Sequence, residues 1–460
     1  MHIFHPSILR EYDVRGIFNE TLFPEDLYTL GRVIARLTQK KVNQQPRIVV
    51  GYDGRLSTPV LVKALHKGLL EEGAHILDIG CGPTPMVSFA HYALEGDAAL
   101  MVTGSHNPKT HNGLKITLQT RPFFGDEIRA LQEHASRLSN EVSSNHTPGQ
   151  IEEINMESLY VQRLIEDITF KQSLKIVWDS GNGAAGRIIE QLVKCIPGDH
   201  VLLNTKIDGT FPSHHPDPTV PENLEEMKQV ILQEGADLGF AFDGDGDRLG
   251  VIDGKGRILW GDQLMILLAE YILRKNPGVP IIADVKASQI LFDKIKEFGG
   301  IPVMERTGHS LIKSKMREIG APLAGEMSGH IFFSDRYYGF DDALYAALRV
   351  LEILAASEKT LADVYEGFPK LESTPEIRLE CQGKDKRDII QKIKESLIHE
   401  KIPFNQLDGI RVSINQSWWG LRASNTQDVL TIRIEAPSVN DLNHLKEDLL
   451  RRLKPFGLLF

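Results

Sequence analysis

Residues 238–252 read Leu238-Gly239-Phe240-Ala241-Phe242, then Asp243-Gly244-Asp245-Gly246-Asp247-Arg248, then Leu249-Gly250-Val251-Ile252. The two apolar runs predict strands, and the polar residues between them predict a loop that joins these strands. Three closely spaced carboxylates repel one another, and oxygen ligands of this kind suit a hard cation such as Mg²⁺ or Ca²⁺. Because the glycines let the backbone curl, the carboxylates can converge on one ion. The stretch therefore predicts a metal-binding loop within a sheet.

An EF-hand loop and a solvated acidic turn are the two alternatives for this aspartate loop, residues 243–248. An EF-hand loop would need glycine at its sixth position and glutamate at its twelfth. Arg248 and Gly254 stand there instead, which excludes that motif. A solvated acidic turn remains the alternative, although the spacing is unusual for one.

Size and composition limit the class of protein. A chain of 460 residues exceeds what one core usually holds, so several domains are expected. A net charge of −10 argues against nucleic acid or an anionic membrane as a partner. Cys81, Cys195 and Cys381 form no disulfide framework, which fits a reducing compartment. Since neither a signal peptide nor a membrane-spanning run is recognisable, we expect a cytoplasmic protein.

Strands and helices alternate along most of the chain. Strands at 48–53, 176–179 and 281–284 share a terminal aspartate, and each is followed later by a strand that runs into a polar loop. This weak repeat predicts three similar α/β units, whose ligands would bind at the carboxyl ends of the strands. After residue 374 the pattern becomes strand, helix, strands and helix, typical of an α+β module.

This pattern divides the chain into four expected domains, at residues 1–150, 151–253, 254–368 and 369–460. The polar residues 140–153 predict a linker between the first two. Glu366-Gly367-Phe368-Pro369 precedes the last domain and predicts a hinge about which that domain moves.

A second distinctive segment, the serine loop, reads Thr103-Gly104-Ser105-His106-Asn107-Pro108 and follows the strand predicted at 100–102. A serine behind a glycine at a strand end suits a nucleophile or a phosphate carrier. Taken alone, the loop could equally be an Asn-Pro turn capped by serine. A serine together with a Mg²⁺ site favours phosphoryl transfer, with phospho-Ser105 completing the oxygen cage of the aspartates.

The two loops resemble those of the α-D-phosphohexomutase family, most closely its bacterial phosphomannomutase/phosphoglucomutase members. In that family the serine loop carries the phosphoserine and the aspartate loop binds Mg²⁺. Gly325-Glu326-Met327-Ser328-Gly329-His330 resembles its sugar-binding loop, and Arg422-Ala423-Ser424-Asn425-Thr426 its phosphate-binding loop. The resemblance implies three similar α/β domains with mixed sheets and a C-terminal α+β domain around a central cleft.

The residues of the last two loops suit these roles. Glu326 and Ser328 lie two apart, so both would face the same side and offer polar groups to sugar hydroxyls. Arg422 offers a fork of donors for a phosphate, beside the hydroxyls of Ser424 and Thr426. Without the resemblance, a polar strand entry and a hairpin turn would describe these segments better.

Further residues match the family pattern. The resemblance implies that Arg15, Lys115, Arg248 and His330 join Ser105 in catalysis, and that Ser105 shares the metal with Asp243, Asp245 and Asp247. It implies a substrate-binding set of Tyr12, Lys286, His309, Glu326, Ser328, His330, Arg422, Ser424, Asn425 and Thr426. Arg55, in Asp53-Gly54-Arg55, is a weaker candidate because strand-end arginines often only pair with a neighbouring carboxylate.

The implied activity is the reversible interconversion of hexose 1-phosphate and hexose 6-phosphate, of mannose and glucose, through phospho-Ser105 and a hexose 1,6-bisphosphate. Mg²⁺ would be the cofactor, and glucose or mannose 1,6-bisphosphate the activator. We expect hexose phosphates as partners and a monomer or weak dimer. Phosphoglucosamine mutase is the alternative, although its sugar loop usually carries glutamine where Met327 stands; a non-catalytic hexose-phosphate sensor is another.

Overall fold

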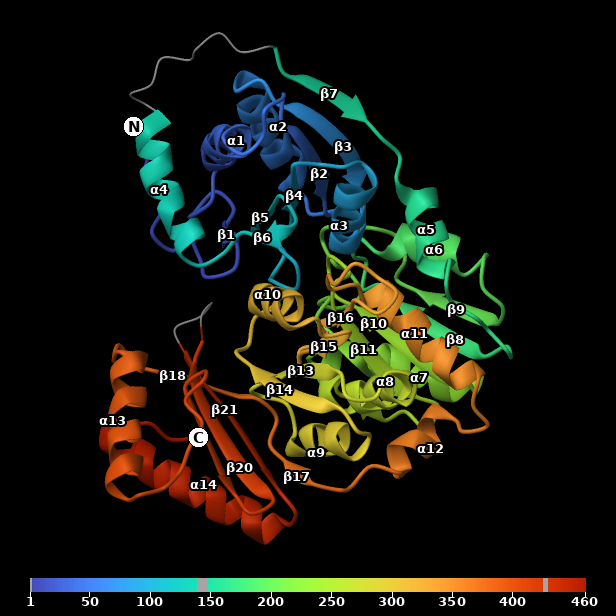
Figure 1. Cartoon of the computed structure of the whole chain (residues 1–460), viewed down its shortest axis with the longest axis vertical. Helices are drawn as coiled ribbons and strands as arrows, with labels where there is room; N and C mark the ends of the chain where they lie inside the picture. Colours follow the sequence, from blue (N-terminus) through green and yellow to red (C-terminus); the bar gives the residue numbers. More distant parts are fainter. Residues whose placement is uncertain (1, 139–147, 425–428) are drawn as a thin grey trace.

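The computed structural model describes residues 2–138, 148–424 and 429–460. Four sheets follow one another along the chain, and Figure 1 shows the first at the top and the last at the lower left. Three sheets are mixed and lie among helices, whereas the strands of the fourth pair antiparallel. The predicted fold class, three α/β domains and a C-terminal α+β domain, is confirmed.

The first domain has a seven-stranded sheet in the order β1-β5-β4-β2-β3-β7, with β6 beside β5. Strands β2, β3 and β4 are parallel, while β5 runs antiparallel to β4. Its elements are β1(Val14–Ile17), α1(Pro24–Gln39), β2(Arg47–Tyr52), α2(Thr58–Glu71), β3(His75–Cys81), α3(Thr84–Ala93), β4(Ala98–Val102), β5(His111–Leu118), β6(Arg121–Pro122), α4(Asp126–Leu138) and β7(Gln150–Glu153).

The prediction of a linker over residues 140–153 is wrong at its carboxyl end. Residues 150–153 form β7, which pairs in parallel with the edge of β3. All four side chains of β7 are exposed, so its sequence carries no apolar alternation from which a strand could be recognised. The rest of the predicted linker lies largely outside the described residues.

The second domain carries the aspartate loop in the hairpin between β10 and β11, two antiparallel strands whose residues are all buried. Its sheet has the order β12-β11-β10-β8-β9. Its elements are α5(Glu157–Ile165), β8(Lys175–Asp179), α6(Gly186–Leu192), β9(Asp199–Leu203), η1(Pro221–Leu224), α7(Glu225–Glu234), β10(Leu238–Phe242), β11(Leu249–Asp253) and β12(Ile258–Leu259).

The third domain has a four-stranded sheet in the order β14-β13-β15-β16. The segment resembling the sugar loop connects β15 to β16, two antiparallel strands. Its elements are α8(Gly261–Lys275), β13(Pro280–Asp284), α9(Gln289–Glu297), β14(Ile301–Glu305), α10(His309–Ile319), β15(Leu323–Gly325), β16(Ile331–Phe333), α11(Ala343–Ala355) and α12(Leu361–Glu366).

The last domain pairs its strands in the order β17-β21-β20-β19, with β18 beside β21. Arg422 lies on β20, and the chain returns along β21. Its elements are β17(Glu372–Ser373), β18(Ile377–Glu380), α13(Lys386–His399), β19(Ile410–Ile414), β20(Ser417–Ala423), β21(Val429–Ala436), α14(Val439–Leu453) and η2(Lys454–Phe456).

The apolar core is divided unevenly among the domains. One continuous cluster of buried side chains includes Met86 of the first domain, Trp178 of the second and Tyr345 of the third. The last domain has a separate cluster, built around Trp419 and Ile432. Within the described ranges, no helix combines the length and the apolar character that crossing a membrane requires.

Candidate active site

The serine loop is a tight, buried turn at the end of β4. Ser105 has a φ of 48°, in the left-handed region, and only 3% of its surface is exposed. Its backbone N–H donates to Thr103 Oγ1 at 2.8 Å, which fixes the turn. Its Oγ donates to Asp243 Oδ2 at 2.9 Å and lies 3.1 Å from His106 Nδ1. The serine hydroxyl therefore lies directly against the aspartate loop.

Arg55 holds the serine loop in place. Its guanidinium pairs with Asp53 at 3.0 Å and donates to the backbone carbonyls of Ser105, Asn107, Pro108 and His111. Arg55 is 1% exposed, and the Phe211 ring of the second domain lies 5.2 Å from it. The sequence indicates only an ion pair between Arg55 and a neighbouring carboxylate, whereas the residue also binds four backbone carbonyls.

The three aspartates form a buried oxygen cluster. Asp243, Asp245 and Asp247 have no exposed surface, and each offers one carboxylate oxygen within 4.8 Å of the other two. Gly246 has a φ of 71°, a conformation that suits glycine in this tight turn. One oxygen each of Asp245 and Asp247 is buried without a hydrogen-bond partner. A buried cluster of carboxylates with unpaired oxygens fits a hard divalent cation.

The charges around this cluster are strongly coupled. Burial, together with repulsion from Asp245 and Asp247, raises the pKa of Asp243 well above its usual range. Lys115 donates to Asp245 at 2.6 Å and to Asp247 at 2.5 Å. Burial alone would lower the pKa of Lys115, but the aspartates outweigh it and raise that pKa, so the side chain is an ammonium. The lysine thus supplies part of the positive charge that the carboxylates need.

Arg248 connects the aspartate loop to the sugar-loop segment. Its Nε donates to His330 Nε2 at 3.1 Å and lies 4.0 Å from Asp243 Oδ2. In the same segment, Glu326 accepts from the backbone N–H of Gly308 at 2.6 Å and from Ser328 Oγ at 2.9 Å. Glu326 and Ser328 therefore face the same side, as their spacing predicts.

Tyr12 and Arg15 extend the first domain toward these loops. The Tyr12 hydroxyl donates to the carbonyl of Thr307 at 2.7 Å, and its ring meets that of His309 edge-on at 6.0 Å. Arg15 is 5% exposed, donates to the carbonyl of Gly104 in the serine loop, and pairs with Asp13. Tyr12 thus links the first domain to the third, and Arg15 lies behind the serine loop.

Lys286 and Arg422 lie where the third and last domains meet. Lys286 donates to Glu376 at 2.8 Å, and Arg422 Nε donates to Asp408 at 2.9 Å. Asp408 also accepts from the backbone N–H of Thr307 at 3.1 Å, which joins the two domains. The carbonyl of Ser424 accepts from Lys386 at 2.9 Å. The predicted residues Asn425 and Thr426 lie outside the described part of the chain.

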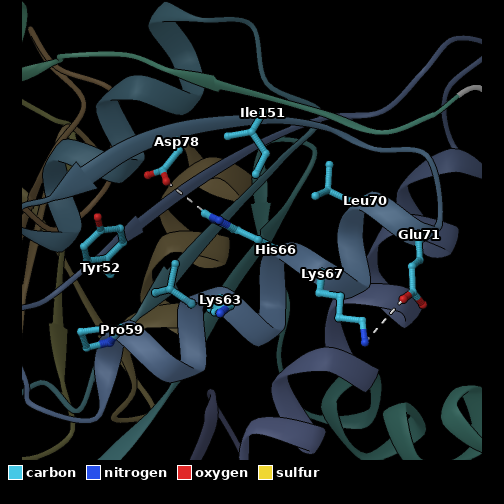
Figure 2. A pocket seen from close by; sticks show the side chains of 10 residues that line it. Tyr52, Pro59, Lys63, His66, Lys67, Leu70, Glu71, Asp78 and Ile151 are labelled. Atoms are coloured by element: carbon cyan, nitrogen blue, oxygen red, sulfur yellow. Dashed lines mark ion pairs between the residues drawn. The ribbon is translucent and has the colours of Figure 1, made fainter.

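One of two surface hollows lies away from the four loops described above. The hollow in Figure 2, of about 560 Å³, lies on the first domain between α2, β3 and β7, and no predicted site residue lines it. Two of its lining residues, His66 and Asp78, lie close together, with Nε2 of the histidine 3.8 Å from Oδ2 of the aspartate. A much smaller hollow between the third and last domains is lined by Lys286, Arg422 and Arg433, among others. We assign the site by its chemistry, and therefore to the converging loops.

Several neighbours of the site were not predicted. Thr84, at the start of α3, donates to Asp245 at 2.6 Å. Burial, with a further contribution from Arg248, lowers the pKa of His106 well below its usual range, which leaves a neutral imidazole beside Ser105. Asp341 contacts both His330 and Lys313. His106 was visible in the serine loop, whereas nothing in the sequence around Thr84 or Asp341 signals these contacts.

Four profiles of one family match the chain in order. They are Phosphoglucomutase/phosphomannomutase alpha/beta/alpha domain I at residues 6–141, domain II at 158–256, domain III at 260–371 and the C-terminal domain at 376–452. The phosphomannomutase/phosphoglucomutase of Pseudomonas aeruginosa is 42% identical over 97% of this chain and 96% of its own length. The phosphoglucomutase of Neisseria gonorrhoeae is 38% identical over 94% of this chain and 93% of its own.

A solved structure agrees with these sequence matches. The crystal structure of a phosphoglucomutase/phosphomannomutase family protein from Burkholderia thailandensis superposes with a TM-score of 0.91 at 39% identity. The match covers 99% of this chain and 98% of that one. Fold and relatives together define an enzyme of the isomerase class. The chain belongs to the phosphoglucomutase/phosphomannomutase family, as the resemblance of its loops predicted.

Proposed function

We propose that this protein reversibly interconverts hexose 1-phosphate and hexose 6-phosphate, with mannose and glucose as the sugars. The observation that carries the proposal is the Ser105 hydroxyl, 2.9 Å from Asp243 in a buried cluster of three carboxylates. The names of the relatives support the same activity, since they include phosphomannomutase/phosphoglucomutase and phosphoglucomutase. Ser105 is proposed to act as a phosphoserine.

The reaction consists of two phosphoryl transfers through Ser105. In the first, the bond between Ser105 Oγ and phosphorus breaks, while the free hydroxyl of the hexose phosphate forms a new bond to that phosphorus. The hydroxyl proton leaves to a base, the departing Ser105 oxygen takes up a proton to become a hydroxyl, and a hexose 1,6-bisphosphate results. This intermediate turns end over end and returns its other phosphoryl group to Ser105, which regenerates the phosphoserine. A bisphosphate added from outside serves as the activator, because it can phosphorylate an unmodified Ser105.

Cationic side chains would stabilise the charge of the moving group. Lys115 is held as an ammonium by the aspartates, and Arg248 lies beside Asp243 and His330. Arg15 supports the backbone of the serine loop through Gly104. Because Lys115 and Arg248 hold their protons tightly, we assign them to charge stabilisation. His330 is the candidate for accepting a proton, at Nε2, which must first lose its hydrogen bond from Arg248.

Asp243, Asp245 and Asp247, with an oxygen of phospho-Ser105, would hold Mg²⁺. The bound ion supplies positive charge that neutralises the transferring phosphoryl group. The unpaired buried oxygens of Asp245 and Asp247 support this assignment. Lys115 must give up part of its contact with these carboxylates when the ion binds, since it bonds to both of them.

The remaining predicted residues would bind the substrate. Glu326 and Ser328 are proposed to contact sugar hydroxyls, beside Tyr12, His309 and His330. Lys286 and the segment from Arg422 through Ser424, Asn425 and Thr426 would bind the phosphate that is not reacting. We retain the four domain ranges 1–150, 151–253, 254–368 and 369–460 as proposed boundaries, each domain bringing one loop. A cytoplasmic location and a monomer or weak dimer are likewise proposed.

A coupled mutase assay tests this function. With Mg²⁺ and a trace of glucose 1,6-bisphosphate, mannose 1-phosphate and glucose 1-phosphate are expected to turn over with comparable kcat/KM, and Ser105→Ala should lose nearly all turnover. Glucosamine 1-phosphate as the best substrate would make the chain a phosphoglucosamine mutase. Lack of turnover on all three sugars would point to a sensor of hexose phosphates.

A further inference from the structure

We propose that Asp341 is a positioning residue that fixes the tautomer and the ring orientation of His330 in the active site. The contribution of Asp341 to catalysis rests on the proposed function, whereas its orientation of the His330 ring does not. Asp341 lies outside all four loops, after β16 and just before α11, and its backbone bridges to Phe332. Its surface is 1% exposed.

The carboxylate of Asp341 divides its contacts between a lysine and two histidines. Oδ1 accepts from Lys313 Nζ at 2.9 Å. Oδ2 lies 3.1 Å from His330 Nδ1 and 3.7 Å from His309 Nδ1. Burial alone would raise the pKa of Asp341, but Lys313 and both histidines hold that pKa well below its usual range. Asp341 is therefore a buried carboxylate with one oxygen facing the two imidazoles.

Arg248 and Asp341 lie on opposite nitrogens of His330 and favour a proton on the same one. An arginine only donates hydrogen bonds, so His330 Nε2, which receives Arg248 Nε at 3.1 Å, must present its lone pair. The proton of a neutral ring then resides on Nδ1, which lies toward Asp341. The donor Arg248 on one side and the negative charge of Asp341 on the other favour the same tautomer. The Nδ1–Oδ2 pair lies 3.1 Å apart but does not have hydrogen-bond geometry, so the carboxylate attracts the Nδ1–H through its charge.

The second histidine extends this arrangement toward the first domain. The rings of His309 and His330 stack with centroids 5.4 Å apart at 21°. The ring of His309 also meets that of Tyr12 edge-on, with centroids 6.0 Å apart. Asp341 thus lies beside both histidine rings, and Tyr12, which contacts the second of them, bonds to Thr307. A carboxylate that orients one ring of this stack restricts the neighbouring rings as well.

A simpler role for Asp341 would be to neutralise Lys313 inside the protein. That role uses only Oδ1 and leaves the position of Oδ2 unexplained. The two roles differ in what an Asp341→Asn substitution does. Lys313 would retain the amide oxygen as its acceptor, so the amide NH₂ would face His330 Nδ1. Two donors, the amide and Arg248, would then compete for a ring that has only one lone pair in its neutral form.

The experiment compares Asp341→Asn with Asp342→Asn, a matched control at the next position. Asp342 is equally buried, but it accepts from Tyr160 and Tyr337 and caps α11, away from the histidines. Long-range ¹H–¹⁵N NMR of ¹⁵N-histidine-labelled protein reports the tautomer of each ring, and His330→Gln assigns the His330 signal. The wild type and Asp342→Asn should show a proton on Nδ1 of His330. In Asp341→Asn, this Nδ1-protonated signal of His330 should be lost.

Steady-state kinetics complete the test. Asp341→Asn should lower kcat roughly 10- to 100-fold, a loss typical of carboxylates that orient functional histidines, with KM nearly unchanged. Asp342→Asn should retain kcat. An unchanged His330 tautomer together with wild-type kcat in Asp341→Asn would overturn the proposal and leave only the pairing with Lys313. If the wild type lacked mutase activity but the NMR pattern changed as expected, the proposed function would fail and the orienting role would stand.

Discussion

Arg55 illustrates, at the scale of single residues, how much one buried side chain can organise. It bonds to four backbone carbonyls around the serine loop and pairs with Asp53, which is 3% exposed. Arg55→Met should lower the free energy of unfolding by roughly 3–5 kcal/mol, because it leaves a buried carboxylate unpaired. Denaturant unfolding measures this loss. Arg137→Met, which removes an exposed ion pair with Glu133, should cost about 0–1 kcal/mol, and an equal loss in both variants would contradict the assignment.

The aspartate cluster makes a prediction about metal binding that does not depend on activity. Mg²⁺ at 100 times its Kd should stabilise the wild type by about 2.7 kcal/mol, seen as a higher Tm. Asp245→Asn should reduce that gain, because it removes one carboxylate of the cage. Asp126→Asn is the control, since that side chain is 97% exposed on α4. A full response to Mg²⁺ in Asp245→Asn would mean that the ion binds elsewhere.

Asp342 predicts how stability depends on pH. Burial raises the pKa of Asp342 to about 6, against roughly 3.9 in the unfolded chain. Because the folded protein then holds the proton more tightly, the free energy of unfolding should fall by roughly 2–3 kcal/mol as pH rises from about 4 to about 6. Asp342→Asn lacks this titration, so its stability relative to the wild type should be greater at pH 7 than at pH 4. Urea unfolding of both proteins at pH 4 and pH 7 measures this difference. If the free energies of unfolding of wild type and Asp342→Asn changed in parallel with pH, the raised pKa of Asp342 would be contradicted.

The sequence predicted site residues unevenly at this scale. Ser105 and the three aspartates stand in short motifs whose spacing alone indicates their chemistry. Asp341 could not be found in this way, because its contacts with His330 and Lys313 depend on how α10, β16 and α11 pack. A contact between residues from separate elements leaves no signature in either segment.

At the scale of elements, Gly308 begins α10 in a conformation that other residues rarely adopt, with a φ of 140°. A Cβ there would overlap the ring of Tyr12, and the Gly308 N–H donates to Glu326. Gly308→Ala should therefore raise KM for hexose phosphate several-fold and destabilise the protein by about 1–3 kcal/mol.

Gly320→Ala provides the control at the other end of the same helix. Gly320 also has a positive φ, 66°, but nothing lies within 4 Å of an added Cβ. This variant should lose about 1–2 kcal/mol of stability while KM stays unchanged. Steady-state kinetics and thermal unfolding separate the two effects. An unaltered KM in Gly308→Ala would mean that Tyr12 and Glu326 do not shape the substrate site.

Elements with a clear apolar pattern were predicted closely. The strands predicted at 48–53 and 100–102 are β2, Arg47–Tyr52, and β4, Ala98–Val102. The edge strand β7 was missed because both of its faces are exposed and its residues are polar or charged, apart from Ile151. Periodicity reports burial, so a strand that buries nothing gives no signal.

At the scale of the whole molecule, the last domain is attached differently from the other three. Its apolar core is separate, and charged groups join it to the third domain, including Arg433 with Asp262 at 2.9 Å and Lys286 with Glu376 at 2.8 Å. Polar interfaces of this kind allow domains to move relative to one another. The hinge predicted at residues 366–369 lies between the third domain and β17, the first strand of the last.

Small-angle scattering tests that movement. Adding hexose 1-phosphate should reduce the radius of gyration of the wild type, because the last domain closes over the bound phosphate. Arg422→Ala should show little change, since it lacks the guanidinium proposed to bind that phosphate. Superimposable wild-type profiles with and without saturating substrate would rule out a closing domain.

The bond between Tyr12 and Thr307 also sets an order of events during protein synthesis. The two residues lie 295 positions apart. At 5–20 residues per second, a ribosome adds that length in roughly 15–60 s. Tyr12 is therefore synthesised well before its partner in the third domain exists. A nascent chain can fold around Ser105 early, but it cannot assemble the wall of the site that Tyr12 and the third domain form together until translation is well past the middle of the message.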